Sequence, residues 1–341
     1  MDGLYVTNLT NIRYLCGFTG SSGSLLVTAD GVRFFTDSRY RLQSAEEVEG
    51  AEVAIYRLEE ELVPLLRAAA ADLAASRIGF EATQVTVSAL ERQRSVLEGR
   101  DLIATSGWVE DLRRIKDPEE LARIRVAAEM ADEALSFILE RVAVGRSERE
   151  LALELELHMR EAGAEGVSFA PIVAVGERSA MPHAHPTEHA VEKGAYLLFD
   201  LGCIYRGYCS DLTRTVVIGP PAQRHQEIYE LVAAAQRQGI QALAPGRAAA
   251  QVDRAAREVI AAGGHAEAFG HGLGHGVGME IHEAPKLGIT SEDVLASGCV
   301  VTVEPGVYLQ GFGGVRIEDL VTVTEIGAEI LSQSPRELIV L

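Results

Sequence analysis

Short apolar runs alternate with helical stretches over the first hundred or so residues. The runs that predict strands lie at residues 4–6, 24–28, 32–36, 53–56 and 77–80. Asp30-Gly31 between the second and third runs predicts a tight turn. Residues 59–75 place apolar side chains at helical spacing. Strands alternating with helices predict an α/β domain at this end of the chain.

A new set of helix signals begins after Trp108, which is therefore a candidate domain boundary. Asp117-Pro118-Glu119-Glu120 combines an N-cap aspartate, a proline at the first helical position and acidic residues in the first turn. Helices are predicted from Pro118 toward Leu139, over 148–162 and over 223–243. The region after Val191 contains long strand pairs with glycine-rich turns.

Composition and charge exclude several classes of protein. The chain has 31 Lys and Arg against 50 Asp and Glu, a formal charge of −19, so neither nucleic acid nor an anionic membrane is expected as the main partner. No apolar run is long enough for a transmembrane helix, and the first residues lack the basic region of a secretory signal. The four cysteines form no C-x-x-C pair, which predicts reduced, mostly buried thiols and a cytoplasmic protein.

One predicted hairpin brings two aspartates together. It joins strands 196–204 and 208–218, and a turn centred on Tyr205-Arg206 would place Asp200 opposite Asp211. Opposed residues of an antiparallel pair point to the same face, with Cβ atoms about 4.5–5.5 Å apart. Two such charges repel by about 4 kcal/mol at 4 Å and an effective dielectric near 20. Either one aspartate takes a proton or a cation lies between them.

A second predicted hairpin, near the C-terminus, does the same with two glutamates. Strands 300–304 and 315–321 flank a turn centred on Gly311, which places Glu304 opposite Glu318. Pro305 cannot donate to a ladder and indicates a bulge at this point.

The alternative for both hairpins is a set of unrelated acids on the solvent face of edge strands. Asp200 weighs against it, because this aspartate directly follows the apolar residues 197–199. A carboxylate within such a run needs a partner.

The segment 270–283 holds three histidines and five glycines between the two hairpins. A phosphate-binding loop is disfavoured, because no Rossmann unit surrounds the segment and such loops need no histidine. Glycines here let the backbone approach a crowded centre, and imidazole beside four carboxylates suits a divalent transition metal. His183 and His185 lie upstream on a predicted loop.

Together these motifs resemble the "pita-bread" dinuclear metallopeptidases, which include methionine aminopeptidase, aminopeptidase P and prolidase. The motifs, in family order, are Phe199-Asp200-Leu201-Gly202, Ser210-Asp211-Leu212-Thr213-Arg214-Thr215, Gly274-His275-Gly276-Val277-Gly278 with His282-Glu283, Val303-Glu304-Pro305-Gly306 and Arg316-Ile317-Glu318-Asp319. Residues 8–24 are similar to the N-terminal domain of the proline-specific branch. The resemblance implies a creatinase-type α/β domain over 1–110 and an α+β pita-bread catalytic domain over 111–341. One departure is that the family's opening helix has no counterpart before the first strand.

The resemblance also implies the catalytic machinery. The implied ligands of two divalent ions are Asp200, Asp211, His275, Glu304 and Glu318. This oxygen-rich set favours Mn²⁺, with Co²⁺ or Zn²⁺ as alternatives. Glu318 is the implied proton acceptor, and His183 and His282 match the family's two non-ligand histidines.

Five further residues are weaker candidates. Arg316, Tyr308 and His271 are expected either to contact substrate or to support the ligands, with a purely structural role open for His271. Arg39 and Arg41 follow an N-terminal strand, where they either form a solvated turn or reach a substrate terminus, in which case a partner subunit's site is one option.

The branch of the family decides the substrate. Methionine aminopeptidases usually lack a domain like 1–110, and creatinases lack the full ligand set. Residues 179–183 resemble the prolidase-like branch, so an Xaa-Pro dipeptidase is favoured over an aminopeptidase P that acts on longer Xaa-Pro peptides. The resemblance implies a homodimer. A non-catalytic module that binds peptides or proteins is the alternative from another class.

Overall fold

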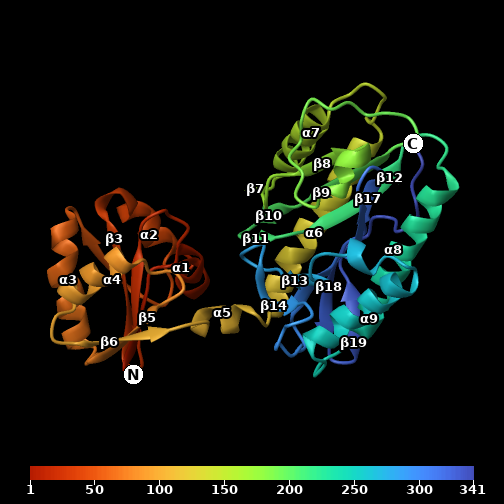
Figure 1. Cartoon of the computed structure of the whole chain (residues 1–341). Helices are drawn as coiled ribbons and strands as arrows, with labels where there is room; N and C mark the ends of the chain where they lie inside the picture. Colours follow the sequence, from red (N-terminus) through yellow and green to blue (C-terminus); the bar gives the residue numbers. More distant parts are fainter. The chain divides into compact units, whose positions relative to one another are not determined.

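The computed structural model describes residues 1–341, which form two compact units, Met1–Leu112 and Arg113–Leu341 (Figure 1). None of the helices combines the length and hydropathy that crossing a bilayer requires. All four cysteines are free and buried, as predicted.

The N-terminal unit is built on a six-stranded mixed sheet with the strand order β4-β3-β2-β1-β5-β6. Its strands are β1 (Gly3–Val6), β2 (Ser24–Thr28), β3 (Gly31–Asp37), β4 (Glu52–Tyr56), β5 (Arg77–Glu81) and β6 (Asp101–Thr105). Its helices are α1 (Leu9–Cys16), α2 (Arg41–Glu47), α3 (Glu59–Asp72), α4 (Val87–Val96) and α5 (Trp108–Arg113), which runs into the next unit. Neighbours Phe34 and Phe35 belong to different apolar clusters, so both faces of the sheet are covered. The α/β prediction is confirmed.

The C-terminal unit combines four long helices with several small antiparallel sheets. The helices are α6 (Pro118–Leu139), α7 (Glu148–Glu161), α8 (Gln223–Ala242) and α9 (Ala249–Ala262). The strands are β7 (Gly166–Val167), β8 (Ile172–Val175), β9 (Tyr196–Leu201), β10 (Cys203–Tyr205), β11 (Tyr208–Cys209), β12 (Leu212–Val217), β13 (Gly274–Gly276), β14 (Glu283–Leu287), β15 (Val300–Val303), β16 (Gly306–Leu309), β17 (Gly313–Arg316), β18 (Asp319–Thr324) and β19 (Gly327–Ile330). The three helices predicted here from sequence are α6, α7 and α8.

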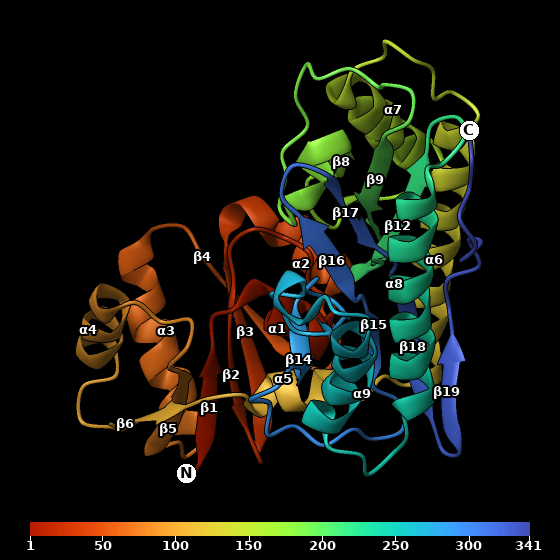
Figure 2. The same cartoon turned by 45° about the vertical axis from the view of Figure 1, so that its right-hand side comes forward.

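Two apolar clusters organise this unit. Helices α6 and α7 pack on the sheet β12-β9-β8, whereas α8 and α9 pack on the five-stranded sheet β14-β13-β15-β18-β19. The β16-β17 hairpin contacts both β9 and α8 and so links the two halves (Figure 2). The β16-β17 hairpin therefore brings the two sheets close together, and polar side chains between them can be shielded from water.

The start of α6 follows the predicted capping pattern. The Glu120 amide donates to Asp117 Oδ1 at 2.8 Å, and the Asp117 amide donates to Glu120 Oε2 at 2.7 Å. Pro118 occupies the first helical position. This capping box satisfies two backbone donors that would otherwise be unpaired, so the helix begins at a fixed residue.

The register predicted for the first hairpin is wrong by two residues. Thr213, and not Asp211, lies opposite Asp200. The turn is centred on Arg206-Gly207, whose φ angles are 47° and 81°. A two-residue hairpin of this kind needs positive φ at both central positions, which favours the pair that contains glycine. Because side chains alternate with a period of two, the shift keeps Asp211 on the same face as Asp200.

The register predicted for the second hairpin is confirmed on both sides of the two glutamates. Val303 lies opposite Asp319 and Gly306 lies opposite Arg316, so Glu304 and Glu318 are in the expected register. The ladder breaks between these pairs, where Pro305 predicted an irregularity. The strand predicted at 315–321 is consequently divided into β17 and β18, whereas the strand predicted at 300–304 corresponds to β15 and is followed by a separate strand, β16.

We expect Arg206→Asn to raise the midpoint of thermal unfolding. Asparagine adopts the left-handed backbone region more readily than arginine, so the free energy of unfolding should rise by about 1 kcal/mol. Circular dichroism melts of the wild type and the variant would measure the change. Arg206→Ala is the control, because it removes the same side chain without this preference. An asparagine variant no more stable than the alanine variant would contradict the assignment of the turn.

Candidate metal centre

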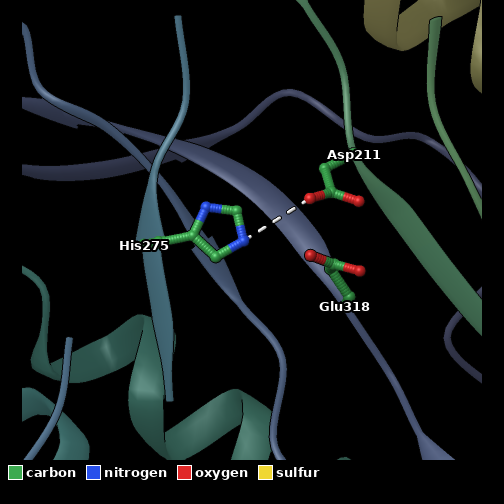
Figure 3. Close-up of side chains that lie close together, drawn as sticks. All are labelled: Asp211, His275 and Glu318. Atoms are coloured by element: carbon green, nitrogen blue, oxygen red, sulfur yellow. Dashed lines mark ion pairs between the residues drawn. The ribbon is translucent and has the colours of Figure 1, made fainter. Parts of the chain in front are cut away.

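Three predicted ligands from separate elements converge in the C-terminal unit. Asp211 precedes β12, His275 lies in β13 and Glu318 lies between β17 and β18. One potential ligand atom of each lies within 4.8 Å of the others. Figure 3 shows the three side chains pointing toward one another. The register of the two hairpins thus delivers acids to one point, although the segments lie far apart in the sequence.

The other two predicted ligands line the same cavity. His275 Nε2 lies 3.6 Å from Asp211 Oδ2 and 3.4 Å from Glu304 Oε1. Asp200 is 8% exposed and lies in β9, at the wall of a cavity of about 1050 Å³ that all five predicted ligands line. The structure therefore brings together every residue that was predicted to hold metal.

Burial disfavours the ionised form of these carboxylates. It raises the pKa of Asp211 and of Glu318, and the neighbouring carboxylates raise both pKa values further. Burial likewise raises the pKa of Glu304 to about 7. Asp200 Oδ1 is buried and has no hydrogen-bond partner in the protein. A divalent cation would supply both the missing partner and the missing positive charge.

His275 is in the correct state to bind a metal. Burial lowers the pKa of its imidazole to about 4, so the ring is neutral at pH 7. Its Nδ1 lies 3.1 Å from the Gly276 carbonyl oxygen, which assigns the proton to Nδ1. Nε2, which faces Asp211 and Glu304, therefore keeps a free lone pair. Four carboxylates and one neutral imidazole fit divalent cations.

Arg316 holds two of the ligands in place. Its Nη2 donates to Asp200 Oδ2, and its Nε donates to Thr213 Oγ1 at 3.0 Å. Thr213 Oγ1 in turn donates to Glu318 Oε2 at 2.6 Å. The guanidinium is 4% exposed, and the acids around it raise its pKa against the effect of burial. Arg316 is therefore a permanent charge inside the site.

Tyr308 and His271 extend this network. Arg316 Nη1 donates to the Tyr308 hydroxyl at 3.1 Å, and His271 Nε2 lies 2.9 Å from the same oxygen. Burial lowers the pKa of His271 to about 4, and its Nδ1 lies 2.8 Å from the Gly272 carbonyl oxygen. A neutral ring with its proton on Nδ1 accepts from Tyr308, so the hydroxyl hydrogen points to His271.

Both histidines predicted to be catalytic also line the cavity. The His282 ring lies against His275, with ring centroids 4.3 Å apart. Burial lowers the pKa of His282. His183 lies in the loop that follows the short 3₁₀ helix Gly176–Ala180.

The two arginines predicted to reach a substrate belong to the N-terminal unit. Arg39 is paired with Asp37 at 2.8 Å and its side chain is 71% exposed, whereas Arg41 is the first residue of α2. Their contact with a substrate stays a prediction.

Sequence reasoning missed Thr213 and Lys286. Thr213 takes the place opposite Asp200 that was predicted for Asp211. Lys286 lies opposite His275 in the β13-β14 ladder and lines the cavity. Pairing of the histidine-rich segment with residues 283–287 would have revealed the lysine, but no turn signal fixed that register.

Comparison with known proteins gives consistent results over the whole chain. Residues 122–325 match metallopeptidase family M24, and residues 1–115 match the creatinase/prolidase N-terminal domain. The uncharacterized peptidase YqhT of Bacillus subtilis is 40% identical over 341 residues, which cover 100% of this chain and 96% of the relative. An Xaa-Pro dipeptidase of Pyrococcus furiosus is 35% identical over 339 residues, covering 99% and 95% of the two chains.

Solved structures agree with these matches. An Xaa-Pro dipeptidase from Bacillus anthracis has a TM-score of 0.97 at 40% identity, with 100% of this chain and 95% of that chain covered. An X-Pro aminopeptidase from Thermotoga maritima has a TM-score of 0.94 at 36% identity, with 100% and 98% covered. The chain therefore belongs to metallopeptidase family M24, the pita-bread family that its five motifs resemble, and it carries a creatinase/prolidase N-terminal domain.

Proposed function

We propose that this metallopeptidase hydrolyses the Xaa-Pro bond of dipeptides. The convergence of four carboxylates, three of them buried, and a neutral histidine in one cavity carries the proposal. Relatives that cover nearly the whole chain include Xaa-Pro dipeptidases of Pyrococcus furiosus and Pyrococcus horikoshii. An Xaa-Pro substrate is consistent with these relatives and with the resemblance of residues 179–183 to prolidases.

Lys286 favours dipeptides over longer peptides. It lies opposite His275, and directly opposed residues of a ladder point to the same face. In a dipeptide the free carboxylate lies on the residue next to the scissile bond, within reach of a cation in the same cavity. A longer peptide has an amide at that position, which pairs less strongly with a charge.

An aminopeptidase P activity on longer Xaa-Pro peptides is the second candidate. The cavity of about 1050 Å³ is at the upper end of the range for small-molecule sites, so it has room for more than two residues. The similar structure of the Thermotoga maritima X-Pro aminopeptidase also favours this alternative.

The proposed cofactor is a pair of divalent ions, with Mn²⁺ favoured by the oxygen-rich ligands. The residues that would hold the ions are Asp200, Asp211, His275, Glu304 and Glu318. Bound ions supply a Lewis acid for the scissile carbonyl and lower the pKa of water.

The side chains around the cavity perform the remaining steps. Glu318, held by Thr213, is the proposed acceptor for the proton of the attacking water. His183 and His282 hydrogen-bond the substrate, and one of them protonates the leaving prolyl nitrogen. Arg316 fixes Asp200 and Glu318 so that neither carboxylate turns away.

Two broader proposals rest on sequence alone. The homodimer is implied by the family resemblance, and the cytoplasmic location follows from the expectation of reduced thiols. Both stay predictions, as does a role for Arg39 or Arg41 at the substrate terminus.

Hydrolysis of Ala-Pro and of Ala-Pro-Ala in Mn²⁺, with products identified by mass spectrometry, tests the proposed function. We expect rapid release of alanine and proline from the dipeptide and little cleavage of the tripeptide. Preferential release of alanine from Ala-Pro-Ala would assign the aminopeptidase activity instead. No cleavage of either peptide, with less than one metal ion bound per chain, would identify a non-catalytic binding module.

Asp211→Asn should lower kcat by at least 100-fold while the protein stays folded. The substitution removes the negative charge of a proposed ligand and keeps its size, so metal binding weakens and the fold persists. Metal content by mass spectrometry, kcat for Ala-Pro and a thermal melt would be measured together. Unchanged metal content and turnover would remove Asp211 from the site.

Lys286→Met should raise KM for Ala-Pro by roughly 10-fold to 100-fold, because a charge-assisted hydrogen bond contributes about 1.5–3 kcal/mol. KM for Ala-Pro-Ala should change little. Lys286→Arg is the matched control, since it keeps the charge. Equal increases in KM for both peptides would show that Lys286 does not read the substrate carboxylate.

A further inference from the structure

A short basic segment, defined here as Arg113–Lys116, enters the C-terminal unit just before α6. Its three cations all pair with acids that border the β13-β14 hairpin. Arg113 contacts Glu280 and Glu283, and Lys116 also contacts Glu283. Arg114 contacts Asp293, which lies beyond β14 at the wall of the cavity. Three cations in four residues thus bind the loops that surround the candidate site.

Glu283 is the centre of these contacts. Its side chain is 6% exposed, and its carboxylate faces Arg113 Nη2 on one oxygen and Lys116 Nζ, at 3.2 Å, on the other. The Glu280 amide donates to Glu283 Oε1 at 2.9 Å. Arg113 and Lys116 are themselves 2% and 1% exposed, so both charges are removed from water. If the carboxylate moved away, both buried cations would lose their partner, and an unpaired buried charge is strongly destabilising.

The backbone is shaped to admit this carboxylate. A Cβ atom at Gly278 would lie 2.5 Å from Glu283 Oε2, so any other residue at this position would force the carboxylate to shift from its place between the two cations. Glu283 lies opposite Gly276 in the ladder, immediately after His282. The loop 277–282 therefore lies between two paired residues of the ladder, and the Glu283 carboxylate is anchored at its C-terminal end.

Within this loop, Ile281 and His282 line the cavity, and His282 is the one that can exchange a proton. Its ring lies against the ring of the proposed ligand His275, with centroids 4.3 Å apart. The His282 ring makes no hydrogen bond within the protein, whereas the carboxylate of its neighbour Glu283 is held by two cations and a backbone amide. The orientation of the His282 ring therefore depends on the position of the adjacent backbone, which the contacts of Glu283 fix.

We propose that Glu283, clamped by Arg113 and Lys116, is a positioning residue that holds His282 toward the scissile bond. This inference rests on the proposed function for the role of His282, but the clamp itself is a property of the chain. The basic segment therefore acts on catalysis through the loop 277–282, without contact with substrate or with metal ligands.

A double-mutant cycle tests whether Glu283 acts through His282. Glu283→Gln keeps the shape and removes the charge, so kcat for Ala-Pro should fall roughly 10-fold or more, with metal content unchanged and KM nearly constant. In a His282→Asn background the same substitution should change kcat by less than about twofold. An equal loss in both backgrounds, or no loss in the first, would overturn the proposal.

Lys116→Met provides a second route if Glu283→Gln does not fold, and Lys116→Arg should restore most of the lost kcat. Arg146→Met is the matched control, because it also removes a cation from an ion pair of this unit, 2.8 Å from Glu154 on α7. This control should leave kcat unchanged. A loss of kcat of the same size in Arg146→Met would indicate a general effect on stability and would contradict the positioning role.

Hydrogen exchange measured by mass spectrometry separates this inference from the proposed function. Amides of residues 277–283 should exchange faster in Lys116→Met than in the wild type, but not in Arg146→Met. A protein that cleaves no Xaa-Pro peptide yet shows this change would refute the proposed function and retain the clamp. Unchanged exchange in both variants would refute the clamp whatever the activity.

Discussion

The structure of the C-terminal unit depends on the burial of like charges at one point. Asp200, Asp211, Glu304 and Glu318 all lie in one cavity, and burial raises the pKa of each. Such a cluster is tolerable only with compensating positive charge. Arg316 supplies part of that charge permanently, and the donor set fits divalent ions for the remainder. Much of the surrounding packing serves to keep these acids from separating.

Backbone contacts reinforce that arrangement. The Glu318 amide donates to the Thr213 carbonyl oxygen at 3.1 Å, and the Glu304 amide donates to the Leu273 carbonyl oxygen at 2.8 Å. Arg214 also donates to the Glu318 carbonyl oxygen, and its own charge is balanced by buried Asp319. The segments that carry the ligands are therefore joined directly, and a shift of one would strain the others.

The sequence predicted what depends on local chemistry and missed what depends on distant contacts. The register around Gly311 was correct because the turn residues determine it, and the start of α6 was correct because Asp117 and Pro118 signal it locally. Asp200 was paired with the wrong residue because the predicted turn was centred on Tyr205-Arg206, one position before the observed centre Arg206-Gly207. The two hairpins pointed to the four carboxylates, whereas the choice of His275 and the full set of five ligands came from the family motifs. No local pattern links Arg113 to Glu283, which lie 170 residues apart.

The breaks in the strand ladders at Glu304 and Glu318 have an evolutionary consequence. Because these two residues leave their own hairpin, their amides are free to bond the segments beside Asp211 and His275. Those bonds involve main-chain atoms and do not require any acidic or imidazole group. A descendant that replaced one ligand would lose its chemistry and still keep the same architecture. The fold can thus persist after catalytic activity is lost, and its cavity can then bind a ligand without cleaving it.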